Sequence, residues 1–174
     1  IVVPDQIDGL KVSTLAGAAL GDFKEVRTLT LPETITRIEN ACFIHMEKLE
    51  EVTLPRSLKM DDFKVGVWMF QWCTSLKRMT FLSAPKYFPP AIFSHCSALE
   101  KVEMPGTTLP RIVGKYTFEE VPTSFRLELK GNETCYRYEH VNNVYTLISE
   151  KTTNEHKSKD FQLSKQLWSA FRSP

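Results

Sequence analysis

A pattern that repeats every 23 to 27 residues constrains this chain more than any other feature. Three near copies of one stretch occur: LEEVTLP at 49–55, LKRMTFL at 76–82 and LEKVEMP at 99–105. Each begins six residues after an aromatic side chain, whose position we call the anchor, and Leu20 occupies that position in the first unit. VRTLTLP at 26–32 and FRLELK at 125–130 extend the series. The anchors, spaced 23, 27, 23 and 25 residues apart, are Leu20, Phe43, Phe70, Phe93 and Phe118. Internal repeats of this length predict a stack of similar units.

Apolar residues recur at fixed offsets from the anchors, and we call each such set a column. The column five residues before the anchor holds Leu15, Ile38, Val65, Phe88 and Val113. The columns nine and eleven residues after it hold Leu29, Val52, Met79, Val102 and Leu127, and Leu31, Leu54, Phe81, Met104 and Leu129. One unit is too short to bury its own apolar face, so the units are expected to stack around one continuous core.

The repeat predicts a solenoid with a parallel sheet along one side. Apolar residues alternate with polar ones near the end of each unit, which is typical of a strand. The expected strands cover 28–31, 51–54, 78–81, 101–104 and 126–129 and pair in that order. Around the anchors, the spacing of Phe43, Met46 and Leu49 predicts a short helical or 3₁₀ turn on the opposite side. The predicted fold class is therefore an α/β repeat solenoid, a right-handed coil with an insertion at 60–67.

The repeat stops after Lys130. Residues 134–149 predict two strands around a turn at Asn142–Asn143. Residues 160–171 predict a helix, because Leu163, Leu167, Trp168 and Phe171 follow helical spacing. An open solenoid end would expose core and sheet edge. We therefore expect a solenoid at 1–130 and a C-terminal α+β cap at 131–174, and the alternative for the second segment is a small separate binding element.

The repeat resembles the BspA-type leucine-rich repeats of bacterial cell-surface proteins. The resemblance is carried by LPETITRIENACFIHMEKLEEVTLP at 31–55 and PPAIFSHCSALEKVEMP at 89–105, and it covers about residues 1–130. It weakens at Val121 and Ser124, where the family pattern has Cys and Leu. The resemblance implies an extracytoplasmic protein, on the cell surface or secreted, that adheres to or binds a protein or glycan ligand. It transfers no catalytic residue.

Composition narrows the function classes further. The net charge is +1 with no long block of like charge, which argues against a nucleic-acid partner. No apolar run approaches the roughly 20 residues of a transmembrane helix. The chain begins at Ile1 and not at Met, so membrane anchoring through a removed signal or lipid segment stays open. No catalytic motif is present, and we expect no enzyme activity and no cofactor.

Histidines and cysteines predict neither a metal site nor a disulfide framework. His45 and His95 share a column two units apart, about 10 Å, which is too far to share a metal ion. Cys73 and Cys96 fall three residues after their anchors, in a column with Phe23 and Met46 that we expect to face inward. We predict that Cys42, Cys73 and Cys96 are buried free thiols. The alternative is a disulfide between the adjacent Cys73 and Cys96.

Two surfaces are candidates for ligand binding. On the sheet face, basic side chains stack at strand spacing beside two acids, and the residues are Arg78, Lys101, Arg126, Glu103 and Glu128. That pattern fits either a mixed-charge ligand face or a solvated charge ladder. The second surface holds Trp68 and Trp72 beside the insertion, and its alternative is that both pack beneath the inserted loop. The predicted function is a non-catalytic binding or adhesion module. The alternative is a structural spacer or accessory domain of a larger surface assembly.

Overall fold

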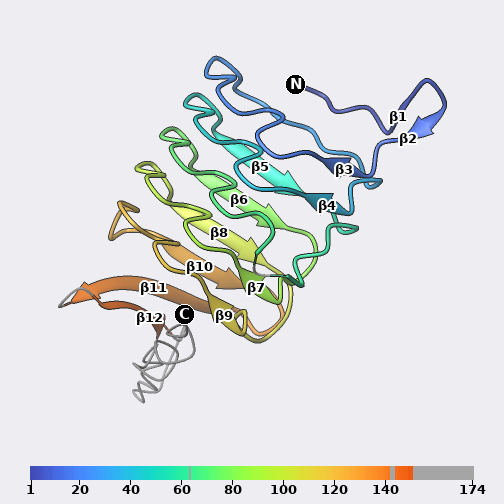
Figure 1. Ribbon diagram of the computed structural model, residues 1–174. Coiled ribbons are helices and arrows are strands. Elements are labelled where there is room, and N and C mark those ends of the chain that lie inside the picture. The colour runs from blue at the N-terminus through green and yellow to red at the C-terminus, as the bar shows by residue number, and fades with distance from the viewer. Residues whose placement is uncertain (63, 142–143, 151–174) are drawn as a thin grey trace, which may run out of the picture.

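The computed structural model describes residues 1–62, 64–141 and 144–150. The chain winds into stacked coils that run from the N-terminal end to a hairpin at the other end (Figure 1). Four parallel strands pair in the order β5 (Glu51–Leu54), β6 (Arg78–Phe81), β8 (Lys101–Met104) and β10 (Arg126–Leu129). These four strands have the predicted bounds and order. At 28–31 the structure has only isolated parallel bridges, from Thr28 to Glu51 and from Val2 to Thr30.

A second parallel ladder follows the column five residues before the anchor. It consists of two pairs, β3 (Thr14–Leu15) with β4 (Arg37–Ile38) and β7 (Tyr87–Phe88) with β9 (Ile112–Val113). The insertion at 60–67 separates these pairs. Within it, Gly66 has a φ of 80°, a left-handed conformation that glycine adopts without the strain a side chain would bring. The sequence predicted that the column residues of this ladder are buried, but it did not predict strands there. These residues are Leu15, Ile38, Phe88 and Val113.

The anchor side of each coil carries turns where the sequence predicted short helices, and no helix occurs among the described residues. Two residues per coil adopt left-handed backbone conformations, two positions before and two positions after the anchor. They are Ala18, Ala41, Trp68, Ala91 and Tyr116, and Asp22, His45, Trp72, His95 and Glu120. In the first four coils their N–H groups donate to the next coil, as from Trp68 to Pro90 O at 3.1 Å and from Trp72 to Ser94 O at 3.0 Å. A helix would direct its N–H groups along its own segment, so bonding between coils replaces it.

The core runs continuously through the stack. Phe43, Phe70 and Phe93 are fully buried, and the rings of Phe43 and Phe70 stack with centroids 5.0 Å apart. In the last coil, buried Phe125 packs against Phe118 at 5.2 Å, one residue beyond the Leu position of the other units. The expectation for Phe23 was wrong, because its side chain is 50% exposed. No earlier coil among the described residues covers it.

The three predicted thiols are buried and free. Cys42, Cys73 and Cys96 are each completely inaccessible to solvent, and none forms a disulfide. Sγ of Cys73 donates to Phe43 O at 3.2 Å. Burial raises the pKa of Cys42 to about 11 and that of Cys73 to about 12, because desolvation penalises the thiolate. These cysteines therefore act as small apolar core residues.

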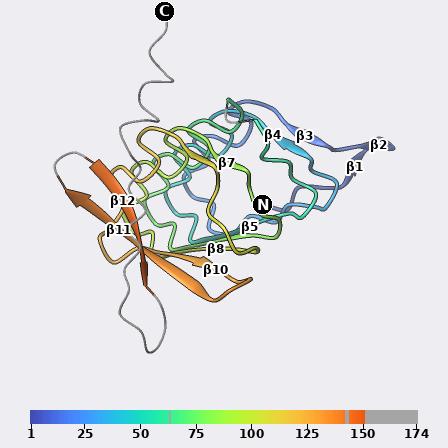
Figure 2. The same cartoon turned by 90° about the horizontal axis from the view of Figure 1, so that it is seen from below.

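Antiparallel strands occur at both ends of the described chain. The N-terminal pair is β1 (Gln6–Ile7) with β2 (Leu10–Lys11). At the other end, β11 (Thr134–Val141) pairs with both β10 and β12 (Val144–Glu150), which confirms the predicted strand pair. Figure 2, which views the molecule from below, places this hairpin beside β10 at the edge of the coil stack. Tyr136 packs against the core. The predicted helix at 160–171 lies outside the described residues.

Candidate binding surfaces

On the sheet face, defined as the outward side of β5, β6, β8 and β10, each of the three predicted basic residues has an acidic partner. Arg78 pairs with Glu51 on the neighbouring strand. Nε of Arg126 lies 3.1 Å from Oε2 of Glu150, which β12 contributes. The basic residues that the sequence placed in one column therefore turn to different carboxylates. This arrangement relieves the repulsion expected between like charges at strand spacing.

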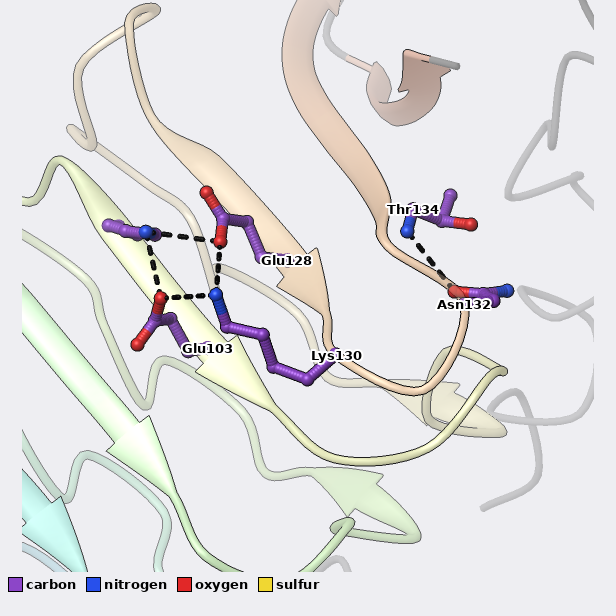
Figure 3. Close-up of polar contacts among 6 residues, drawn as sticks. Glu103, Glu128, Lys130, Asn132 and Thr134 are labelled. Atoms are coloured by element: carbon purple, nitrogen blue, oxygen red, sulfur yellow. Dashed lines mark hydrogen bonds and ion pairs between the residues drawn. The ribbon is translucent and has the colours of Figure 1, made fainter. Parts of the chain in front are cut away.

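At the β8 and β10 end of the sheet face, two lysines and two glutamates form a closed ring of ion pairs (Figure 3). Nζ of Lys101 lies 2.7 Å from Glu103 and 3.0 Å from Glu128. Nζ of Lys130 lies 2.8 Å from each of the same two carboxylates. Hydrogen bonds from Lys101 and then from Lys130 lower the pKa of Glu103 to about 2. Lys101 and Lys130 in turn have raised pKa values, because both glutamates favour their charged forms.

Sequence reasoning missed Lys130. The signal was available, because Lys130 follows Glu128 by two residues and a strand places such residues on one side. Of the predicted residues, the structure brings Lys101, Glu103 and Glu128 together, whereas Arg78 and Arg126 lie in separate pairs. A ligand that uses these basic groups has to compete with carboxylates already in place.

The second surface, which we call the aromatic corner, consists of Trp68, Trp72, His45 and His95. Trp68 is 48% exposed and Trp72 is 42% exposed, so the alternative that both pack beneath the inserted loop is wrong. Trp72 stacks on His95 with ring centroids 3.9 Å apart and planes 7° apart. It meets His45 edge-on at 6.3 Å. One ring from each of three successive coils therefore forms a continuous aromatic stripe.

Carboxylates orient the two imidazoles of the aromatic corner. Nδ1 of His45 lies 2.8 Å from Oδ1 of Asp22 in the preceding coil. Nε2 of His95 lies 3.8 Å from Oε2 of Glu119 in the following coil. The same Glu119 oxygen accepts a hydrogen bond from Oγ of buried Ser94 at 3.0 Å, which fixes the carboxylate. The stripe thus ends in an acid at each side.

Trp68 and Trp72 differ from the residues at the same left-handed positions of the adjacent coils, which are Ala and His. Among non-glycine residues, Asn, Asp and His enter this backbone region most readily, and Asp22, His45 and His95 follow that preference. Trp68 and Trp72, with φ values of 58° and 63°, do not follow it, and neither do Ala18, Ala41, Ala91, Tyr116 and Glu120. A residue held in a sparsely populated region costs about 1–3 kcal/mol. A half-exposed indole recovers only part of its burial energy.

The described residues were also compared with the requirements of a metal site and of a membrane-spanning helix. Among them, no group of three or more His, Cys, Asp or Glu side chains is arranged to hold a metal ion. No helix in that part of the chain is long and apolar enough to cross a membrane. Two open hollows of about 430 and 300 Å³ lie beside the sheet, and Leu82 lines both. Thr28, Thr30 and Thr53 line the larger hollow.

Stacked coils whose parallel strands pair along one side, with turns on the opposite side, define a leucine-rich-repeat-like solenoid. The model of the BspA-type leucine-rich repeat region matches residues 14–128 in six copies. The chain therefore belongs to the BspA-type leucine-rich repeat family, as the sequence resemblance predicted.

Comparison with individual proteins adds little detail. The chain is similar to a crystal structure of a leucine-rich repeat protein from Bacteroides ovatus, with 15% sequence identity and a TM-score of 0.30. The match covers 74% of this chain and 52% of the Bacteroides protein, so the chain spans about half of that relative's length. A search of curated proteins found no match.

Proposed function

We propose that this chain is a non-catalytic module that binds a protein outside the cytoplasm, and that the aromatic corner is its main contact surface. The observation that carries the proposal is the pair of half-exposed tryptophans, Trp68 and Trp72, at positions where the adjacent coils carry Ala and His. Tryptophan is enriched among the residues that dominate binding energy at protein interfaces.

The family supports the general part of this proposal. BspA-type leucine-rich repeats are generally non-catalytic and are generally associated with bacterial surfaces. A solenoid also presents equivalent positions from each coil as one extended surface, which suits a protein ligand better than a small molecule. A glycan ligand is a separate proposal, and no contact among the described residues favours it over a protein ligand. Membrane anchoring is also a separate proposal, and no contact among those residues supports it.

The sheet face is the second candidate surface. Arg78, Lys101 and Arg126 with Glu103 and Glu128 present both signs of charge over three neighbouring strands. Because these groups already pair with one another or with neighbours, we place the sheet face after the aromatic corner.

We also propose that residues 131–174 cap a solenoid formed by residues 1–130. The support is the pairing of β11 with β10, which covers the last parallel strand, together with the packing of Tyr136 against the core. An uncovered strand at this position would offer its free N–H and C=O groups to other chains.

A binding screen with a matched double variant tests the main proposal. Trp68→Ala and Trp72→His introduce the residues that the adjacent coils carry at the same positions, so the fold should tolerate both. The wild-type chain and the variant are applied to arrays of purified proteins and of glycans. We expect protein ligands that bind the wild type and lose at least tenfold in affinity with the variant. Binding of no protein would favour the structural spacer, and glycan binding alone would contradict the protein ligand.

A further inference from the structure

Charge is distributed unevenly along the anchor side of the coils. The anchor turns comprise residues 17–22, 40–45, 67–72, 90–95 and 115–120. The three middle turns contain no Asp, Glu, Lys or Arg. The first turn contributes Asp22, and the last contributes Lys115, Glu119 and Glu120. The two end turns therefore contain three carboxylates and one ammonium group in total. The three middle turns have no such charged side chain, and the third turn carries both tryptophans.

This layout is that of an interface with an aromatic centre and a polar rim. In protein interfaces, charged residues are depleted at the core and aromatic residues are enriched there. Here the rim is acidic at both ends, so it favours a partner with basic groups on either side of an apolar centre. A partner with acidic ends would bring like charges beside Asp22 and Glu120, which are both exposed.

We propose that the aromatic corner and its acidic ends are the docking surface for an extended, basic segment of a partner protein, with Lys or Arg near both ends and apolar residues at the centre. This inference rests on the proposed function and specifies the chemistry of the partner. Five coils at about 4.8 Å spacing span roughly 19 Å, and an extended chain at about 3.3 Å per residue covers that length with about six residues.

The geometry of Trp72 favours a peptide over a sugar. His95 stacks on one face of the indole at 3.9 Å, and His45 closes its other side at 6.3 Å. The ring is therefore not an open platform for a flat sugar face, whereas Trp68, which is 48% exposed, is accessible to aliphatic and basic side chains. Lys and Arg interact favourably with the faces of indole rings.

Selection from a random peptide library tests the charge preference without requiring a known partner. The library is panned against the wild-type chain and, in parallel, against the Trp68→Ala/Trp72→His variant. We expect peptides enriched on the wild type alone to carry Lys or Arg at their ends and apolar residues between. Enrichment of neutral or acidic peptides, of the same peptides on both proteins, or of no peptide would overturn the proposal.

The best selected peptide is then measured by fluorescence anisotropy against a twin in which Glu replaces its Lys and Arg residues. We expect the basic peptide to bind at least tenfold more tightly than its twin, and added salt to reduce the difference. Asp22→Asn combined with Glu120→Gln should weaken the basic peptide several-fold at an unchanged thermal midpoint. An unchanged affinity in that folded variant would contradict the proposal that the acidic ends bind the basic groups of the partner.

These results separate the inference from the proposed function. Proteins that bind through Trp68 and Trp72 but show no charge preference would leave the proposed function standing and remove the basic partner. Proteins that bind regardless of the two tryptophans would remove the aromatic corner itself. Self-association of the wild type that the double variant abolishes would identify a second copy of this chain as the occupant and overturn the inference.

Discussion

The sheet face and the aromatic corner are built from the same coils but treat their neighbours in opposite ways. On the sheet face, Lys101, Glu103, Glu128 and Lys130 satisfy one another across the strands. On the aromatic corner, rings replace charges through the three middle coils, and Trp72 stays 42% exposed. A solenoid brings equivalent positions within about 4.8 Å of one another, so the side chains of every column have to make favourable contacts with those of the adjacent coils. Paired charges close a surface, whereas stacked exposed rings leave it open to a partner.

The largest expected effect is a loss of stability when a buried phenylalanine is removed, compared with removal of an exposed one. Phe93→Ala should destabilise the fold by about 3–5 kcal/mol, because it leaves a cavity between stacked coils. The side chain is fully buried and contacts Phe88 and Phe118 at ring distances of 5.7 and 6.0 Å. Denaturant titration measures the difference. Phe23→Ala is the control, and because that ring is 50% exposed it should cost less than about 1 kcal/mol. Equal losses in the two variants would contradict the predicted column of buried anchors.

The next effect concerns the layer directly behind the aromatic corner. Thiol reagents should label Cys73 and Cys96 very slowly in the native protein near neutral pH, although each directly follows a surface residue in the chain. Both thiols are buried, and burial raises the pKa of each far above neutral, so almost no accessible thiolate is present. Mass spectrometry after timed labelling measures the rate, with the unfolded chain as the fast reference. Rapid native labelling would show that the corner opens locally.

The repeat alone predicted the parallel strands, because apolar alternation is a local signal that the stacking of units reinforces. The column pattern wrongly predicted that Phe23 is buried. Burial also requires a preceding coil that covers the side chain, and the residues of the column carry no information about that coil. The turns around the anchors were misassigned because spacing by three fits both a helix and consecutive turns. The choice between them lies in backbone bonds from Ala41 to Val67 O and from His45 to Gln71 O, which join different coils. Exposure of Trp68 and Trp72 follows from those turns, so the sequence named both residues but could not place them.

An acid titration tests whether the ring on the sheet face is as closed as its distances indicate. The pKa of Glu103 is lowered from its ordinary 4.5 to about 2. A group with a lowered pKa stabilises the fold above its unfolded value, and that contribution is lost as the pH falls through the folded value. We therefore expect wild type to be more stable than Glu103→Gln near neutral pH. The gap in thermal midpoint should shrink as the pH falls from about 4.5 to about 2. Glu120→Gln, outside the ring, is the control, and a pH-independent gap would contradict the ion-paired ring.

The smallest expected effect returns to the comparison between the two surfaces. Changing Arg78, Lys101 and Arg126 together to Ser removes the basic residues of the sheet face without touching the aromatic corner. Because those side chains are engaged by neighbouring carboxylates and surface pairs contribute at most about 1 kcal/mol each, the fold should lose little stability. If the aromatic corner is the docking surface, the affinity for its ligand should change less than about threefold, under roughly 0.7 kcal/mol. A loss of tenfold or more in the folded triple variant, with binding retained by Trp68→Ala/Trp72→His, would reverse the order of the two surfaces and make the sheet face the ligand site.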